Sequence, residues 1–220
     1  MEARRARILT AATALMTDDG PDGLSMRRLA ESADVSVNTI YNLIGPRDAV
    51  VAALVDQVIE SIASAVDQKT GDGPLERCLA IVAHATEVVV ENQDLTRPLA
   101  REIFGHSGPG SALAHTWGAE TLGSAIAAAI DAGVLENRVS PTTLAETVYA
   151  VWANSALSWA HGVIDADGFE ARSLAAVHMA LLTTTTAGSE PELRRGLDDW
   201  SIRLEASRPH KAPSPSRNIA

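Results

Sequence analysis

The stretch from Ser25 to Ile44 constrains the fold of this chain most strongly, because its pattern predicts two short helices joined by a tight turn. Ser25 and Ser36 each stand just before a helical pattern and can cap it through a backbone N–H group. Asp34 lies between the two patterns, and aspartate tolerates the left-handed backbone of a sharp turn better than most residues. Two such helices make a helix-turn-helix, whose second helix enters the major groove of DNA.

The second helix of this motif separates apolar from polar side chains. Ile40 and Leu43 face inward, whereas short polar groups and a tyrosine face outward. Groups of this kind can contact base edges and phosphates. We therefore predict DNA contacts for this face, for two arginines of the preceding helix and for the arginine that opens the next helix: Arg27, Arg28, Ser36, Val37, Asn38, Thr39, Tyr41, Asn42 and Arg47.

Further motifs follow one another in order from residue 4 to residue 49. They are an arginine-rich helix (Arg4–Met16), Gly20-x-x-Gly23-Leu24-Ser25, Leu29-Ala30-x-x-Ala33-Asp34-Val35-Ser36, Thr39-Ile40-Tyr41 and Pro46-Arg47-Asp48-Ala49. This series resembles the N-terminal domain of the tetracycline-repressor (TetR) family of bacterial transcription regulators. The resemblance implies a phosphate contact for Tyr41. The chain departs from the family pattern at Asp34, where glycine is usual.

Helical periodicity continues through the rest of the chain, and no segment alternates as a strand would. The fold class is therefore all-α: an N-terminal three-helix helix-turn-helix domain (1–48) and a C-terminal helical ligand-binding and dimerisation domain (49–207), joined by a long helix. Residues 208–220, rich in proline, serine and basic residues, are predicted to be disordered. The other predicted helices are 2–18, 46–69, 74–92, 95–104, 111–132, 141–163, 169–187 with the run Thr183–Thr186 included, and 191–206.

The net charge of −10 looks unfavourable for a DNA-binding protein, but most of it lies outside the first domain. Residues 1–48 carry 6 arginines and 7 acidic residues, and the local arginine cluster matters more for DNA than the total. Cys78 is the only cysteine, which excludes an intrachain disulfide and a multi-cysteine zinc site. We expect a cytoplasmic protein that does not enter the membrane.

Large rings concentrate in the second domain. A core position is the ordinary place for a tryptophan, but rings beside a few polar groups also line small-molecule pockets. We predict such a pocket, lined by Phe104, Trp117, Trp152, His84, Glu87, His115 and Asn154. Pairs of His and Glu at helical spacing, such as His84 with Glu87, admit a metal site, but spacing alone is weak evidence. We expect no metal, no cofactor and no catalytic residue.

Small residues are frequent on the helices near 141–163 and 169–187, and the resemblance implies that these two helices form the interface of a homodimer. Together these patterns predict a repressor that binds double-stranded operator DNA and is released by a small, mainly apolar effector. Two alternatives remain open: an all-α enzyme or metal-binding bundle protein, and a DNA-bound regulator without small-molecule sensing. No hydrolase elbow, phosphate loop or paired Glu-x-x-His motif supports an enzyme.

Overall fold

The computed structural model describes residues 1–69, 71 and 73–207, so the tail predicted to be disordered, 208–220, lies outside the described residues. Within these ranges the chain forms α-helices and no strand, which confirms the all-α prediction. The helices are α1 (Glu2–Gly23), α2 (Met26–Ser32), α3 (Val37–Leu43), α4 (Arg47–Lys69), α5 (Pro74–Glu91), α6 (Gln93–Gly105), α7 (Pro109–Asp131), α8 (Pro141–Ala160), α9 (Ala166–Leu182) and α10 (Glu190–Ala206).

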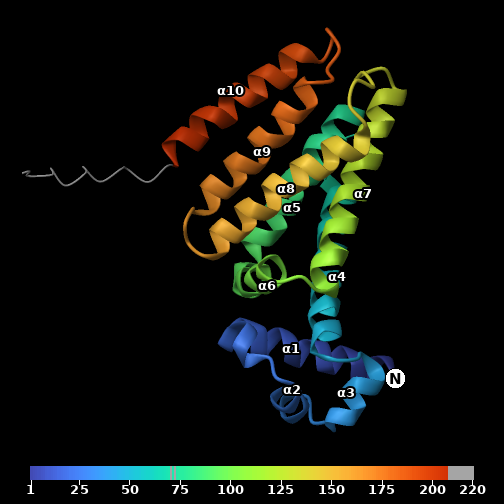
Figure 1. Cartoon of the computed structure of the whole chain (residues 1–220), viewed down its shortest axis with the longest axis vertical. Helices are drawn as coiled ribbons and strands as arrows, with labels where there is room; N and C mark the ends of the chain where they lie inside the picture. The colour runs from blue at the N-terminus through green and yellow to red at the C-terminus, as the bar shows by residue number, and fades with distance from the viewer. Residues whose placement is uncertain (70, 72, 208–220) are drawn as a thin grey trace, which may run out of the picture.

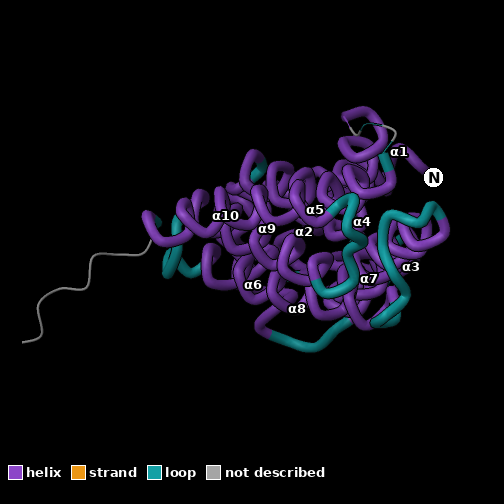
Figure 2. The backbone as a smooth tube through the Cα atoms, turned by 90° about the horizontal axis from the view of Figure 1, so that it is seen from above, coloured by secondary structure: helices purple, strands orange, loops and turns teal. Residues whose placement is uncertain are grey.

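The helices are arranged as a head and a larger bundle (Figure 1). Helices α1, α2 and α3 form the head, helices α5 to α10 form the bundle, and α4 runs from one to the other. Seen from above, the bundle helices lie in layers beside α4 (Figure 2). Each part has its own buried core, and three side chains, Val58, Phe104 and Trp117, pack against both cores. These three side chains therefore connect the packing of the head with that of the bundle.

The local signals of the helix-turn-helix are confirmed. The Ser25 side chain accepts a hydrogen bond from the Arg28 N–H at 3.3 Å, and the Ser36 side chain accepts one from the Thr39 N–H at 3.1 Å. Asp34 has a positive φ of 50°, the left-handed conformation that the tight turn requires. Ile40 is fully buried and holds α3 against the head.

The run Thr183–Thr186 was predicted as helix, and this is wrong, because α9 ends at Leu182. The Glu136 N–H donates to the Thr184 carbonyl at 2.6 Å, and the Thr186 hydroxyl donates to the Val134 carbonyl at 3.1 Å. Threonine hydroxyls that bond to a neighbouring backbone compete with the helix ladder. The run therefore fastens the end of α9 to the loop between α7 and α8.

Helix α9 is enclosed within the protomer, which changes the predicted dimer interface. It packs against α5, α8 and α10. Its apolar row, Leu174, Val177 and Leu181, is buried in the bundle core and has no surface to offer a partner. Met179 is the exposed large apolar side chain of this helix, at 52%. Any interface on this side must therefore use the outer faces of α8 and α10 together with a narrow strip of α9.

One described segment, Arg47–Gln68 of α4, has the length and the mean hydropathy, 1.7, of a helix that crosses a membrane. Length and composition alone are weak evidence, since the core helix of a soluble protein passes the same test. Here the apolar side chains of α4, including Val50, Leu54 and Ile62, are buried against neighbouring helices. The hydropathy of α4 is thus explained by its place between the two cores.

Helix α10 approaches α9 closely at His178. A Cβ atom at Gly196 would lie 2.3 Å from His178 Nε2, so only glycine permits this approach. His178 Nδ1 lies 2.7 Å from the Leu174 carbonyl oxygen. Burial lowers the pKa of His178, while its bond to Leu174 and the charge of Glu192 act in the opposite direction. The folded protein therefore favours the neutral imidazole.

This preference predicts a loss of stability in mild acid. The unfolded chain takes up a proton near the ordinary histidine pKa of about 6.5, whereas the folded chain resists protonation until a lower pH. The contribution of the neutral His178 side chain to the free energy of unfolding is complete above the unfolded pKa of about 6.5, and it is lost as the pH falls towards the lower pKa of the folded protein. Urea unfolding near pH 8 and near pH 5.5 should show a smaller pH-dependent loss for His178→Asn than for the unmodified protein. Equal losses in both proteins would contradict this assignment.

Candidate DNA interface and ligand cavity

The outer side of α3 forms a continuous exposed face on the head. Val37 and Tyr41 are 36% and 50% exposed, and Asn38 and Asn42 beside them are exposed as well. Ser36 and Thr39 stand at the start of this face, where their hydroxyl oxygens lie 2.8 Å apart. The structure therefore brings together, along the two turns of α3, six of the residues predicted to contact DNA: Ser36, Val37, Asn38, Thr39, Tyr41 and Asn42.

The two arginines of α2 differ in how firmly they are held. Arg27 pairs with Glu31 at 3.1 Å, but both side chains are exposed, and exposed pairs of this kind contribute little. Arg28 bonds to the Gly23 carbonyl at 3.2 Å and also pairs with Asp19. Arg27 is therefore the freer of the two to turn towards a phosphate, while Arg28 fastens α2 to the end of α1.

Arg47, predicted as a phosphate contact, points into the protein instead. Its Nε atom donates to the Leu24 carbonyl at 3.0 Å and its Nη2 atom to the Pro21 carbonyl at 2.9 Å. Its Nη1 atom donates to a carboxylate oxygen of Glu102 in α6. This bond to Glu102 is the main reason why the pKa of Arg47 is raised. Arg47 thus links the head to the bundle, and we revise its role accordingly.

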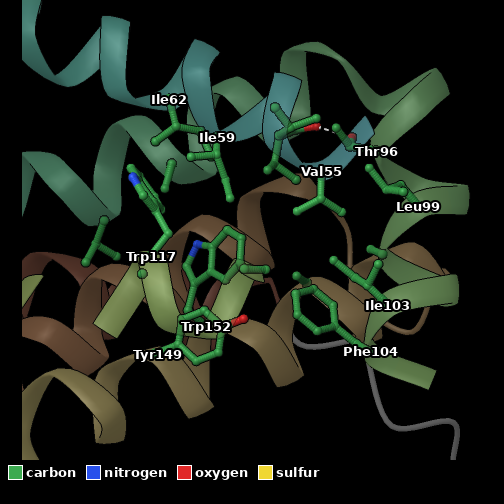
Figure 3. A pocket seen from close by; sticks show the side chains of 18 of the residues that line it. Val55, Ile59, Ile62, Thr96, Leu99, Ile103, Phe104, Trp117, Tyr149 and Trp152 are labelled. Atoms are coloured by element: carbon green, nitrogen blue, oxygen red, sulfur yellow. Dashed lines mark hydrogen bonds between the residues drawn. The ribbon is translucent and has the colours of Figure 1, made fainter. Parts of the chain in front are cut away.

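A cavity lies inside the bundle between α4 and α8 (Figure 3). It measures about 90 Å³, where one ordered water needs about 10–15 Å³ on the same scale. Its wall is almost entirely apolar, and the three rings predicted for a pocket, Phe104, Trp117 and Trp152, are part of it. The remaining lining residues are Val55, Val58, Ile59, Ile62, Ile81, Val82, Ala85, Val89, Thr96, Leu99, Ala100, Ile103, Ala114, Gly118, Leu122, Val148, Tyr149 and Ala156.

The Trp152 ring is fixed from several sides. Its indole N–H donates to the Thr86 hydroxyl oxygen at 3.0 Å. The Phe104 ring meets it edge-on at 6.2 Å between centroids, and the Tyr149 ring lies at the same distance. Phe169 of α9 packs on it at 5.7 Å. A side chain held in this way gives the cavity a preformed wall, which lowers the entropic cost of binding.

The four predicted polar groups do not reach the cavity. His84 and Glu87 pair with each other at 2.8 Å on α5, and neither lines it. His115 and Asn154 are exposed on α7 and α8. The prediction of these four residues as lining the cavity is therefore wrong, and no His, Glu or Asn is among the described residues of its wall. Two polar side chains of the wall were not predicted from the sequence: Thr96 on α6 and Tyr149, which stands three residues before Trp152 on α8.

Metal-binding side chains do not gather anywhere in the part of the chain that the structure describes. No group of three or more His, Cys, Asp or Glu side chains there lies close enough to hold a metal ion. Glu102, which stands four residues before His106, is engaged with Arg47. Its position is therefore explained without a metal.

A helix-turn-helix whose second helix, here α3, is exposed on the head is a motif of DNA-binding proteins. Residues 8–54 match the sequence model described as bacterial regulatory proteins, tetR family. Over these residues the chain is similar to the TetR family, and the likeness to regulators of this family indicates a transcription regulator rather than an enzyme. This sets aside the alternative of an all-α enzyme.

Two relatives are repressors by name. The chain is 32% identical over 101 residues to the HTH-type transcriptional repressor KstR of Rhodococcus jostii, which covers 46% of this chain and 48% of that protein. It is 26% identical over 159 residues to KstR of Mycolicibacterium smegmatis, covering 71% of this chain and 76% of the relative. The first match thus spans about half the length of the relative.

Solved structures show the same fold. SmeT, the repressor of the Stenotrophomonas maltophilia multidrug efflux pump SmeDEF, superposes with a TM-score of 0.66 at 18% identity. The superposition covers 84% of this chain and 91% of SmeT. At this level of identity the likeness concerns the fold alone.

Proposed function

We propose that this chain is a transcriptional repressor that binds operator DNA as a homodimer and releases it when a small, mainly apolar molecule occupies the cavity. The observation that carries the proposal is the exposed face of α3, with Tyr41 and two asparagines, on a capped helix-turn-helix. The repressor function named for both KstR relatives supports it. The DNA contacts proposed are Ser36 to Thr39, Tyr41, Asn42 and Arg27.

The proposed release depends on a connection between cavity and head. Helix α6 lines the cavity with Leu99 and Phe104, and Glu102 of the same helix bonds to Arg47 at the head. A ligand can shift DNA affinity only if it binds one arrangement of the two parts better than another. A coupling of about 1–3 kcal/mol would weaken operator binding roughly 5- to 150-fold.

The proposed homodimer uses the outer face of the α8–α10 side. These three helices lie side by side, with α9 in the middle (Figure 1). Each contributes an exposed large apolar side chain: Val151 at 41%, Met179 at 52% and Ile202 at 68%. A two-fold dimer would present two α3 helices to two half-sites at a fixed spacing, as tight operator binding requires.

DNA fragments selected in vitro from a random pool test the DNA-binding function. Tyr41→Ala is expected to weaken binding to all selected fragments by about tenfold or more, because a hydrogen bond to a charged phosphate contributes about 1.5–3 kcal/mol. Asn38→Ala is expected to change the base preference at one position, since base contacts carry sequence information. Asn137→Ala, in an exposed loop of the bundle, is the matched control. Unchanged affinity and sequence preference in both head variants would sink the proposal.

A further inference from the structure

The side chains of the cavity wall restrict the charge and the polar groups of the ligand, in addition to its size and apolar character. This inference rests on the proposed function of the cavity as the effector site. No charged side chain is among the described residues that line it. Burying an ionised group without a partner costs far more than binding returns, so a charged ligand does not fit. The ligand must therefore be neutral over the part that enters the cavity.

Two polar side chains of the wall, Thr96 and Trp152, already make hydrogen bonds within the protein. The Thr96 hydroxyl donates to backbone carbonyls near the end of α5, those of Val89 and Asn92. The Trp152 indole N–H donates to Thr86. Because both donors already have acceptors within the protein, neither Thr96 nor Trp152 is free to donate to an oxygen atom of a ligand.

Tyr149 differs from these residues because its hydroxyl makes no hydrogen bond to any described residue. Burial raises the pKa of Tyr149 to about 12, so the group keeps its proton under physiological conditions. In Figure 3 the Tyr149 oxygen points in the direction of the Phe104 ring, while the indole nitrogen of Trp117 lies at the far end of its ring from Tyr149. This hydroxyl oxygen is not fully buried, so water can reach it. A ligand that covers it without accepting its proton leaves it unpaired, at a cost of about 1–3 kcal/mol, and a ligand oxygen in the right place avoids this cost.

The Tyr149 ring is held in place at the seam between α7 and α8. A Cβ atom at Gly118 would lie 2.7 Å from Tyr149 Cδ2, so the ring rests directly on the backbone of α7. The His115 ring meets it edge-on at 5.1 Å between centroids. These contacts fix the direction of the hydroxyl before any ligand binds, and a preformed donor discriminates better than a mobile one.

We infer that the cavity binds an uncharged molecule with an apolar body and one carbonyl-type oxygen, and that the Tyr149 hydroxyl donates to this oxygen and so determines specificity. A site built around one hydrogen bond rejects an analogue that lacks the oxygen, because its own polar group is then left unpaired. A purely hydrocarbon ligand of the same shape is thus bound more weakly.

Three matched probes test the inference: acetophenone, α-methylstyrene, in which a methylene group replaces the oxygen, and benzoate, which is charged. Binding to the full chain is followed by the fluorescence of the cavity tryptophans and by calorimetry. The unmodified protein is expected to bind acetophenone about tenfold more tightly than α-methylstyrene, and benzoate most weakly. In Tyr149→Phe, acetophenone and α-methylstyrene are expected to bind equally. Tyr41→Phe is the matched control, since the chain has 2 tyrosines and Tyr41 lies on the head.

A second variant tests the same hydroxyl independently, in case Tyr149→Phe does not fold. Gly118→Ala displaces the Tyr149 ring and is expected to reduce the preference for acetophenone while leaving the hydroxyl in the protein. Equal binding of acetophenone and α-methylstyrene by the unmodified protein, with no effect of Tyr149→Phe, would overturn the inference but leave an apolar effector site standing. If none of the probes binds, or if bound probes leave operator affinity unchanged, the sensing part of the proposed function fails as well.

Discussion

Replacing Arg47 with alanine is expected to lower the free energy of unfolding by about 2–3 kcal/mol, or the melting temperature by roughly 4–12 °C. The variant leaves the Glu102 carboxylate, whose side chain is only 18% exposed, without its partner. It also removes the donors to the Leu24 and Pro21 carbonyls. Thermal and urea unfolding measure the effect. Arg27→Ala, which breaks an exposed pair, is the control and is expected to change stability by less than about 0.5 kcal/mol.

The same variant separates a structural link from a phosphate contact. Each arginine that neutralises a phosphate adds about 0.9 to the slope of log affinity against log salt concentration. For a structural link, this slope is expected to stay the same in Arg47→Ala. A slope lower by about one unit, with unchanged stability, would restore the phosphate contact predicted from the sequence.

Under the proposed function, the link is the route by which a ligand in the cavity changes the position of the head. Ile103 and Phe104 of α6 line the cavity, and Glu102 beside them holds Arg47. Arg47 in turn bonds to the segment between α1 and α2. Glu102→Gln keeps the shape of this contact but removes its charge, so we expect a smaller ligand-induced loss of operator affinity. If the ligand weakens operator binding by the same factor in Glu102→Gln and in the unmodified protein, the effect of the ligand is transmitted by the apolar contacts of α4 alone.

The helix-turn-helix could be predicted closely because its signals are local. The caps at Ser25 and Ser36 and the turn at Asp34 depend on residues within a few positions of one another. The Arg47–Glu102 pair could not be found in this way, because its partners are 55 residues apart. At a helix N-terminus beside a recognition helix, an arginine facing a phosphate and one facing a neighbouring helix have the same sequence pattern.

The cavity residues also could be predicted only in part from the sequence. Phe104, Trp117 and Trp152 could be predicted for its wall because large rings in a helical bundle must be buried somewhere. Their polar neighbours could not, because a small rotation of a helix decides whether a side chain faces the cavity or the solvent. His84 and Glu87 satisfy each other on α5 instead. Tyr149 carried a usable signal, since it stands at i, i+3 from Trp152 on the same helix.

Replacing Val151 with arginine is expected to yield a monomer whose affinity for a complete operator is roughly a hundredfold or more below that of the unmodified protein. Val151 is 41% exposed on α8, so the substitution leaves the bundle core intact and places a charge in the proposed dimer interface. Ala156 on the same helix would be a poor choice, because it is fully buried and lines the cavity. An arginine there would disrupt the fold and could not report on dimerisation.

The size of the effect follows from the two half-sites. Joining two heads makes the second contact intramolecular, and such a connection commonly raises affinity 10²- to 10⁴-fold. Sedimentation at micromolar concentration and titration of fragments with one and two half-sites measure both consequences. Ala128→Arg, on the exposed side of α7, is expected to remain dimeric and to bind normally. For a single half-site, Val151→Arg should match the unmodified protein, because its α3 face is unchanged. A dimeric Val151→Arg would move the interface elsewhere, and a monomer with full operator affinity would show that the two heads act independently.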